Sequence, residues 1–193
     1  MFVLTVDQRG SRSDRDRVPD VLDRYASAGT VRPFDRTAGD EVQAVFAAAD
    51  EVAAIAVDLA VTGNWSVGLG VGAVDLPLPA ATRAGRGQAF EAAREAVESA
   101  KHDRRRIQVV GASAWATHAQ TAAVLLVDIL TNRSVAGRSA VDLMRTGVTQ
   151  ASAAQRLGIT PQAMSSRLAA AGWDLQQPAE DLLVRLLTEA DAS

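Results

Sequence analysis

A ten-residue stretch of the chain, WSVGLGVGAV at 65–74, alternates large apolar residues with serine and glycine. Successive side chains of a β-strand point to opposite faces, so this strand has one bulky face and one flat face. Glycine weakens a strand, and three glycines at alternate positions therefore need a structural reason. We expect a helix to pack closely on the flat face, and the alternative is close approach of a ligand. The bulky face carries Trp65, Val67, Leu69 and Val71, and the flat face carries Ser66, Gly68, Gly70 and Gly72.

Other segments of the first 112 residues predict further strands and helices. Short runs rich in β-branched residues indicate strands, and apolar residues spaced three and four apart indicate helices. Their order is β-α-β-β-α-β-α-β, which predicts an α+β sheet domain whose first part has the β-α-β-β-α-β order of a ferredoxin-like core. The predicted strands are 2–6, 31–36, 41–46, 65–74 and 107–110, and the predicted helices are about 15–28, 47–61 and 88–101.

The composition changes after Gly111, and the remaining residues show helical patterns without a strand. We therefore predict two domains, the sheet domain at 1–112 and an all-α domain at 113–193. Helix 115–131 is strongly apolar and is expected to pack on the sheet domain or on a second copy of the chain. The last helix carries an apolar stripe that suits either a homodimer interface or the core. That stripe consists of Leu182, Leu183, Leu186 and Leu187.

Residues 149–171 have the pattern of a helix-turn-helix. Thr149 is expected to cap a first short helix, and Thr160, followed by Pro161, is expected to cap a second one. Between them, Gly158 provides the glycine that such a turn needs. The pattern resembles the helix-turn-helix of the LuxR family and of sigma-factor region 4. The apolar residues with the spacing that holds two short helices at a steep angle are Ala153, Ala154, Leu157, Ile159, Met164 and Leu168.

The second helix of this motif carries outward polar side chains that suit hydrogen bonds to base edges and phosphates. Residues 113–193 contain six arginines and no lysine against seven acidic residues, so one such unit is expected to bind DNA weakly. The alternative is a helical packing or dimerisation module without DNA binding. The predicted DNA contacts are Thr149, Gln150, Thr160, Gln162, Ser165, Ser166 and Arg167.

Two aspartates stand where predicted strands meet turns. Asp7 ends the first strand, and Asp40 follows the Gly39 turn between the second and third strands. If the strands beside these turns are neighbours, the two carboxylates lie within a few ångströms of each other, next to Glu41. Carboxylates are hard oxygen ligands that suit Mg²⁺ or Mn²⁺, so we predict a metal site at these three residues. The alternative is that each aspartate caps a turn or a helix.

Two segments that contain glycine and arginine are candidates for phosphate binding. Residues 9–17 contain four arginines and follow the first strand. Their backbone amides, around Gly10 and Ser11, form either a phosphate-binding turn or a solvated loop. Arg86 lies between glycines at the expected start of helix 88–101, a position that suits a phosphate site or an ordinary turn.

Four stretches of the chain together resemble the SatD family: VDQRGSR, RTAGDEVQAVF, WSVGLGVG and RAGRGQAFEAAREAVESAK. The N-terminal domain of that family is in turn similar to class III nucleotide cyclase and GGDEF domains, and related proteins carry a C-terminal helix-turn-helix. The resemblance implies that Asp7 and Asp40 bind the metal ions that hold a purine nucleoside triphosphate, and that Arg36 helps to read the base. It also implies that Arg94 stabilises the transition state, whereas Phe90 stands where the family has an asparagine. Losing such a donor costs about 10²–10³ in rate, so we expect nucleotide binding without efficient formation of a cyclic product.

The overall composition limits the remaining possibilities. The formal net charge of −3 argues against broad basic patches for nucleic-acid binding, but not against a small DNA-reading surface. The absence of cysteine excludes disulfides, zinc–thiolate sites and cysteine nucleophiles. No catalytic constellation surrounds His102 or His118, which we expect on the surface. We find neither a signal-peptide pattern nor an apolar run long enough for a membrane span, and therefore expect a cytoplasmic protein.

These features predict a cytoplasmic, dimeric transcriptional regulator with a nucleotide- and metal-sensing sheet domain and a DNA-binding helical domain. The first alternative is a nucleotidyl cyclase or related phosphoryl-transfer enzyme that uses Asp7, Asp40 and Arg94. The second alternative is a non-catalytic interaction or scaffold protein in which the aspartates are only structural.

Overall fold

Five strands form one mixed sheet in the computed structural model, which describes residues 1–193. The strand order is β2-β3-β1-β4-β5. Strand β1 lies antiparallel between β3 and β4, β2 is antiparallel to β3, and β5 is parallel to β4. The turn expected at Gly39 joins the second and third strands, which form an antiparallel hairpin. The strands are β1 Phe2–Gln8, β2 Thr30–Arg36, β3 Glu41–Phe46, β4 Trp65–Val71 and β5 Ile107–Gly111.

Helices are interleaved with the strands and then occupy the whole C-terminal part of the chain. The expectation of an α+β sheet region followed by an all-helical region is confirmed. The helices of the first part are α1 Val18–Arg24, α2 Ala49–Val61, the short 3₁₀ helix η1 Thr82–Ala84 and α3 Gln88–His102. The C-terminal helices are α4 Ala114–Thr131, α5 Val135–Arg145, α6 Gln150–Arg156, α7 Pro161–Ala170 and α8 Trp173–Ala192.

Two predicted elements are at least three residues longer than the observed ones. The first helix does not span 15–28, because the side chain of Asp16 accepts a hydrogen bond from the backbone N–H of Val18 at 3.0 Å and Pro19 follows in the first turn. Proline is favoured in the first turn of a helix because it lacks the N–H group that would be unsatisfied there. The strand expected at 65–74 ends at Val71, where the next residue, Gly72, takes a φ of +154°.

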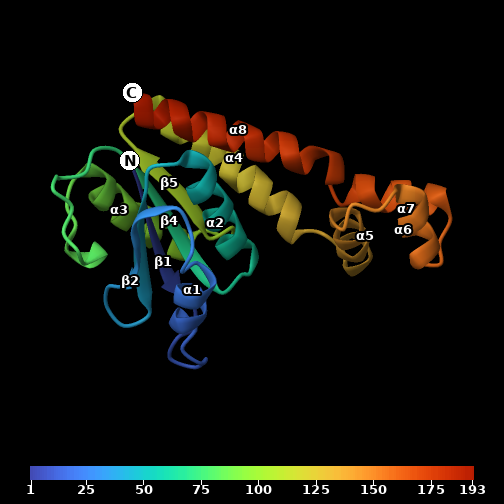
Figure 1. The fold of residues 1–193 in the computed structure, drawn as a ribbon, viewed down its shortest axis with the longest axis horizontal. Coiled ribbons are helices and arrows are strands. Elements are labelled where there is room, and N and C mark those ends of the chain that lie inside the picture. The colour runs from blue at the N-terminus through green and yellow to red at the C-terminus, as the bar shows by residue number, and fades with distance from the viewer.

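Helix α3 packs on the flat face of β4, as expected (Figure 1). A Cβ atom added to Gly68 would lie 2.2 Å from the backbone nitrogen of Val97, and one added to Gly70 would lie 2.1 Å from the carbonyl oxygen of Ala89. Both distances are far inside van der Waals contact, so only glycine allows the helix to lie this close to the sheet. The helix-packing interpretation of the alternating glycines is therefore confirmed.

The opposite face of the sheet is covered by α2, α4 and α8, which share one core with it (Figure 1). Leu126 of α4 and Leu183 and Leu187 of α8 are buried in that core together with Leu4 of β1. Helix α4 thus takes one of its two expected positions, on the sheet. The predicted boundary at residue 112 falls between β5 and α4, two elements that contribute to the same core. Of the two roles expected for the leucine stripe, core and dimer interface, Leu183 and Leu187 take the core role.

Helices α4 and α8 extend from the sheet as a paired arm, and helices α5, α6 and α7 form a three-helix unit at its far end (Figure 1). This unit has a core of its own, with seven buried residues. Thr149 and Thr160 cap α6 and α7 as expected, because each hydroxyl accepts a hydrogen bond from the backbone N–H group three residues further on. The expected inward residues are confirmed: Ala153, Ala154, Met164 and Leu168 are buried, and Leu157 and Ile159 pack against them.

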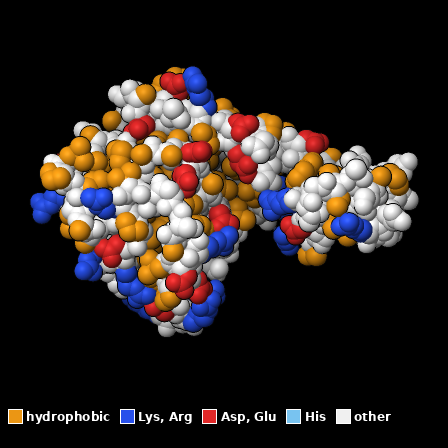
Figure 2. Space-filling view, in the orientation of Figure 1, with side chains coloured by type: hydrophobic (Ala, Val, Ile, Leu, Met, Phe, Trp, Pro, Cys, Tyr) orange, Lys and Arg blue, Asp and Glu red, His pale blue; other side chains and the backbone are white.

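Charged side chains of both signs are interspersed over the face shown in Figure 2, without a continuous basic stripe. His102 and His118 are exposed, as expected. Leu182 of the leucine stripe is 52% exposed. None of the helices combines the length and the apolar character that crossing a bilayer requires.

Candidate functional site

The antiparallel pairing of β1 with β3 brings the predicted acidic residues to one end of the sheet, where β1 ends and β3 begins. This end of the sheet is the Asp7 edge. Asp7 is paired with Glu41 in the strand register, and the backbone N–H of Gln8 donates to the carbonyl oxygen of Asp40 at 3.1 Å. Strands β1 and β3 are thus neighbours, which is the condition under which the carboxylates of Asp7 and Asp40 were expected to approach each other. The hydroxyl of Thr37 donates to Oε1 of Glu41 at 2.5 Å, so the Glu41 carboxylate is hydrogen-bonded within the β2–β3 hairpin.

The electrostatic surroundings of Asp7 favour a cation. Its side chain is 19% exposed. Burial raises the pKa of Asp7, hydrogen bonding and charge from Lys101 oppose that shift, and the carboxylates of Asp40 and Glu98 add to it. A partly buried carboxylate beside other carboxylates is stabilised in its ionised form by a nearby positive charge.

Lys101 supplies such a charge and is the only lysine in the sequence. Its Nζ lies 3.1 Å from Oδ2 of Asp7 and 2.7 Å from Oε1 of Glu98. Burial disfavours the charged lysine, but its hydrogen bonds to Glu98 and Asp7 outweigh burial and raise its pKa. Sequence reasoning missed Lys101. A detectable signal was the glutamate three residues before it on an amphipathic helix, a spacing at which such side chains meet.

The segment after β1 folds back onto Gln8. The side-chain amide of Gln8 donates to the carbonyl oxygen of Arg15 at 2.7 Å and accepts from the backbone N–H of Arg17 at 2.8 Å. Gly10, with a φ of +67°, is exposed, and Ser11 is half-buried. The ion pairs on this segment are Arg15–Asp20 and Arg17–Asp14. The segment is therefore a hydrogen-bonded turn next to the acidic edge, and two of its four arginines are already paired.

Arg36 joins this turn to the β2–β3 hairpin. Its guanidinium donates to Oδ2 of Asp16 at 2.5 Å and to the carbonyl oxygen of Gly39 at 3.1 Å. Six of the eight predicted metal and nucleotide residues therefore gather at one end of the sheet, Glu41 among them. The other five are Asp7, Gly10, Ser11, Arg36 and Asp40.

Arg86 and Arg94 lie elsewhere and line a hollow of about 690 Å³ beside the first half of α3. Arg94 is two helical turns before Lys101, a separation of about 10 Å along the axis. Arg86 precedes the helix altogether. The structure thus does not bring Arg86 to the Asp7 edge, and Arg94 lines the same hollow as Arg86.

Phe90 is a core residue. It is 1% exposed, and its ring lies over Gly85, where an added Cβ would be 2.0 Å from the ring carbon Cζ. Val3 and Val45 belong to the same buried cluster. The position at which the family resemblance implies an asparagine therefore faces the interior and does not contact solvent.

The two aspartates fit a divalent cation only with help from other ligands. The structure contains no group of three or more histidine, aspartate or glutamate side chains arranged to hold one metal ion. Asp7, Asp40 and Glu41 therefore do not form a preassembled three-ligand centre. Mg²⁺ is commonly held by one or two carboxylates together with water and substrate phosphates, so a cation at Asp7 and Asp40 would need such further ligands and would compete with Lys101, whose Nζ lies 3.1 Å from Oδ2 of Asp7.

The predicted DNA-contact residues lie together on the three-helix unit. Six of the seven are exposed, and Arg167 is half-buried. The exposed ones are Thr149, Gln150, Thr160, Gln162, Ser165 and Ser166. The hydroxyls of both threonines also cap their helices, at 3.2 Å from the nitrogen of Ser152 and 3.1 Å from that of Ala163.

No protein-family model, curated protein or solved structure matches this chain. Its class therefore follows from its own geometry. It is an α+β protein in which one sheet edge gathers two aspartates, a lysine and a polar turn, and in which a separately packed three-helix unit presents a polar outer surface.

Proposed function

We propose that the chain is a DNA-binding transcriptional regulator whose sheet domain senses a purine nucleotide together with Mg²⁺ or Mn²⁺. The observation that carries the DNA-binding part is the three-helix unit. Helices α6 and α7 are joined by a tight turn at Gly158, pack on a core of their own, and expose glutamine and serine side chains on α7. This arrangement supports a helix-turn-helix, in which the second helix enters the major groove of DNA.

The strand order supports a ferredoxin-like, cyclase-type interpretation of the sheet domain. The elements β1-α1-β2-β3-α2-β4 follow in the order of that core, and β3 lies between β1 and β2 as in a split βαβ unit. In this interpretation Asp7 and Asp40 hold the metal ion, which neutralises nucleotide phosphates when it is bound. The turn at Gly10 and Ser11 contacts phosphate, and Arg36 contacts the base.

The DNA-binding part is tested by selecting duplexes from a randomised pool and measuring their affinity at fixed salt. Replacing Gln162 and Arg167 by alanine should abolish specific binding, because base-edge and phosphate contacts are both lost. Arg185→Ala is the matched control, since Arg185 is an exposed arginine on α8, outside the three-helix unit. Specific binding that survives in the double variant would contradict a recognition role for α7.

The nucleotide-sensing part is tested by thermal shift and calorimetry with ATP, GTP and cyclic nucleotides, with and without Mg²⁺ or Mn²⁺. A ligand at about 100 times its Kd stabilises the fold by about 2.7 kcal/mol. That effect should require the metal and disappear in Asp40→Ala, whereas Asp50→Ala, an exposed acid on α2, should retain it. Because Lys101 is the only lysine, its protection from amine-reactive labelling reports directly on occupancy beside Asp7.

A second candidate is a phosphoryl-transfer enzyme that uses Asp7, Asp40 and Arg94. The buried position of Phe90 favours sensing over formation of a cyclic product. Turnover of ATP or GTP that disappears in Asp40→Ala would favour the enzyme. Aspartate variants that change stability but no ligand affinity would instead support the third candidate, an interaction or scaffold protein.

We also propose that the regulator is a cytoplasmic homodimer. Two copies double the number of phosphate contacts available to a unit with few basic residues, which strengthens binding to DNA. Leu182, exposed on α8, is a candidate contact between copies. Light scattering of the purified protein, with Leu182→Lys as the comparison, tests this arrangement.

A further inference from the structure

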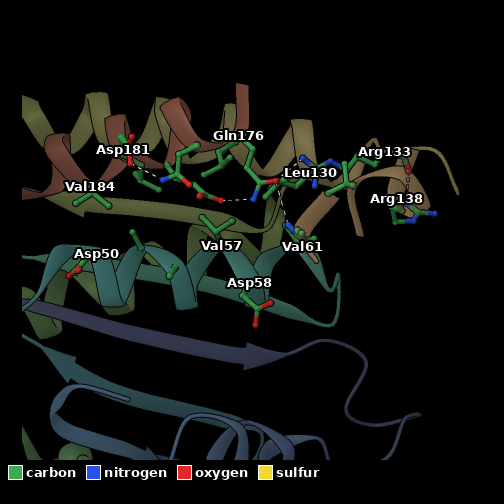
Figure 3. Close-up of a pocket in the computed structure, with 18 of the residues that line it drawn as sticks. Asp50, Val57, Asp58, Val61, Leu130, Arg133, Arg138, Gln176, Asp181 and Val184 are labelled. Carbon is green, nitrogen blue, oxygen red and sulfur yellow. Dashed lines mark hydrogen bonds between the residues drawn. The ribbon is translucent and has the colours of Figure 1, made fainter. Parts of the chain in front are cut away.

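A cavity of about 510 Å³ lies where α2, α4, α5 and α8 meet, between the sheet core and the three-helix unit (Figure 3). Its wall is apolar along much of its length and includes Val57, Val61, Leu130 and Val184. A volume of this size is typical of small-molecule sites. The cavity shares none of its lining with the Asp7 edge.

Arg133 closes one end of this cavity. It is 7% exposed, and its guanidinium donates to the carbonyl oxygen of Ala171 at 2.8 Å and to Oε1 of Gln176 at 2.8 Å. Gln176 is held in this orientation because its own amide nitrogen donates to Glu180 at 2.7 Å. Both acceptors of Arg133 are neutral, although buried charges are normally paired with an opposite charge.

Charged side chains of both signs surround Arg133 at this end of the cavity. Arg138 and Arg145 of α5 also line it, and the acids there are Asp142 and Glu180. Asp142 lies 3.7 Å from Arg145, so it neutralises that arginine in part. Burial lowers the pKa of Arg133, Arg145 lowers it further, and the two acids oppose the shift. The arginines thus supply the donors for a carboxylate at this end, although the whole lining holds five acids against three arginines.

Each of the other three acids of the lining accepts a hydrogen bond or forms an ion pair away from Arg133. Asp58 points away from the cavity in Figure 3, and its Oδ2 lies 2.7 Å from the guanidinium of Arg24. Asp181 accepts a hydrogen bond from Gln177 at 2.9 Å. Asp50 accepts one from the backbone at the start of α2. These acids still disfavour a ligand with two or more negative charges, because such a charge would be repelled over the whole cavity.

We propose that this cavity binds a small organic carboxylate with an apolar body. The carboxylate contacts Arg133 and Arg145, and guanidinium groups are well suited to bind it in a bidentate manner. The apolar body lies against Val57, Leu130 and Val184. Since α5 belongs to the three-helix unit and α2 to the sheet core, the bound molecule touches both and favours one arrangement of the two parts. The inference does not depend on nucleotide binding at the Asp7 edge.

Calorimetry of the full chain with phenylbutyrate, octanoate and indole acetate tests the proposal, with phenylbutanol as the uncharged analogue. At least one carboxylate should bind with a stoichiometry of one, and phenylbutanol should bind about tenfold more weakly or not at all, a difference that one charge-assisted hydrogen-bonded pair explains. Arg145→Gln should weaken binding about tenfold for the same reason. Ala54→Trp should weaken it, because Ala54 is an exposed lining residue and the larger side chain takes up part of the cavity.

Arg185→Gln, on the outer side of α8, is the matched control and should bind as the wild type does. Both test positions are exposed side chains, and circular dichroism verifies that their variants fold. The proposal is overturned by the absence of binding for all three carboxylates at millimolar concentration. It is equally overturned by phenylbutanol binding as tightly as phenylbutyrate, or by unchanged binding in folded Ala54→Trp.

Discussion

Nε of Arg133 lies 2.8 Å from the carbonyl oxygen of Ala171, and this hydrogen bond ties together the two connections between the three-helix unit and the rest of the chain. Arg133 belongs to the connection from α4 to α5, and Ala171 to the connection from α7 to α8. The unit has its own core, so these two connections and the nearby side chains decide how it is held against the α4–α8 arm.

Replacing Arg133 by methionine should therefore weaken the attachment of the three-helix unit to the α4–α8 arm. The change leaves the Ala171 carbonyl without its donor, and an unsatisfied buried group costs about 1–3 kcal/mol. Urea denaturation should show that loss, and hydrogen exchange should accelerate in α5–α7 first. Arg156→Gln is the control, because Arg156 is an exposed arginine of the same unit. Equal stability of Arg133→Met and the wild type would show that the hydrogen bond has no structural role.

The contact between α3 and β4 predicts a severe effect of a single methyl group. In Gly70→Ala the new Cβ would stand 2.1 Å from the carbonyl oxygen of Ala89, so the helix must move away from the sheet. Overpacking of this kind costs about 3 kcal/mol, measured by chemical denaturation. Ser66→Ala, on the same face of the same strand, adds no atom and should cost far less. A fully stable Gly70→Ala protein would mean that α3 shifts without loss of packing.

Tyr25 predicts a loss of stability at high pH. Burial raises its pKa above the ordinary value of 10.0, and its hydrogen bond to the Asp58 carboxylate raises it further. A raised pKa in the folded state means that the contribution to stability is complete below about pH 10 and declines as the pH rises above it. Because Tyr25 is the only tyrosine, the ultraviolet absorbance of tyrosinate follows this one group and should appear at lower pH in the urea-unfolded chain.

The Tyr25→Phe variant separates this effect from general alkaline unfolding. It removes the hydroxyl that donates to Asp58, and the loss of such a hydrogen bond costs about 1 kcal/mol near neutral pH. The difference in stability between wild type and variant should shrink above pH 10, where the wild type also loses the bond. A difference that stays constant into alkali would contradict the raised pKa.

Some of the fold follows from local rules that the sequence displays directly. The alternating glycines of β4 predicted a close helix, because only a missing Cβ allows that approach. The caps at Thr149 and Thr160 were predictable for a similar reason, since a hydroxyl before a helix satisfies an N–H group of its first turn. The α+β order followed from the change between strand-like and helical periodicity along the chain.

Other features depend on tertiary packing and could not be read from local patterns. The pairing of Lys101 with Asp7 joins the end of α3 to the end of β1, and no spacing in the sequence links these positions. Amphipathicity indicated that α4 and α8 have apolar faces and left the sheet or a second copy open for α4, but it did not show that both helices join the sheet core across the expected boundary at residue 112. The separation of Arg86 from the acidic edge likewise depends on how α3 runs over the sheet.

The separate cores of the two parts predict two kinds of unfolding. Met164 is fully buried among the seven core residues of the three-helix unit, whereas Leu187 is fully buried in the core shared by the sheet, α2, α4 and α8. Each change to alanine should cost about 2–5 kcal/mol through lost burial and a residual cavity. In Met164→Ala, hydrogen exchange should accelerate across α5–α7 while β1 and β4 stay protected, because a small independent core opens locally. In Leu187→Ala, the sheet should lose protection together with α8, since that helix completes the sheet core. Loss of protection throughout the chain in Met164→Ala would instead mean that the two cores unfold as one cooperative unit.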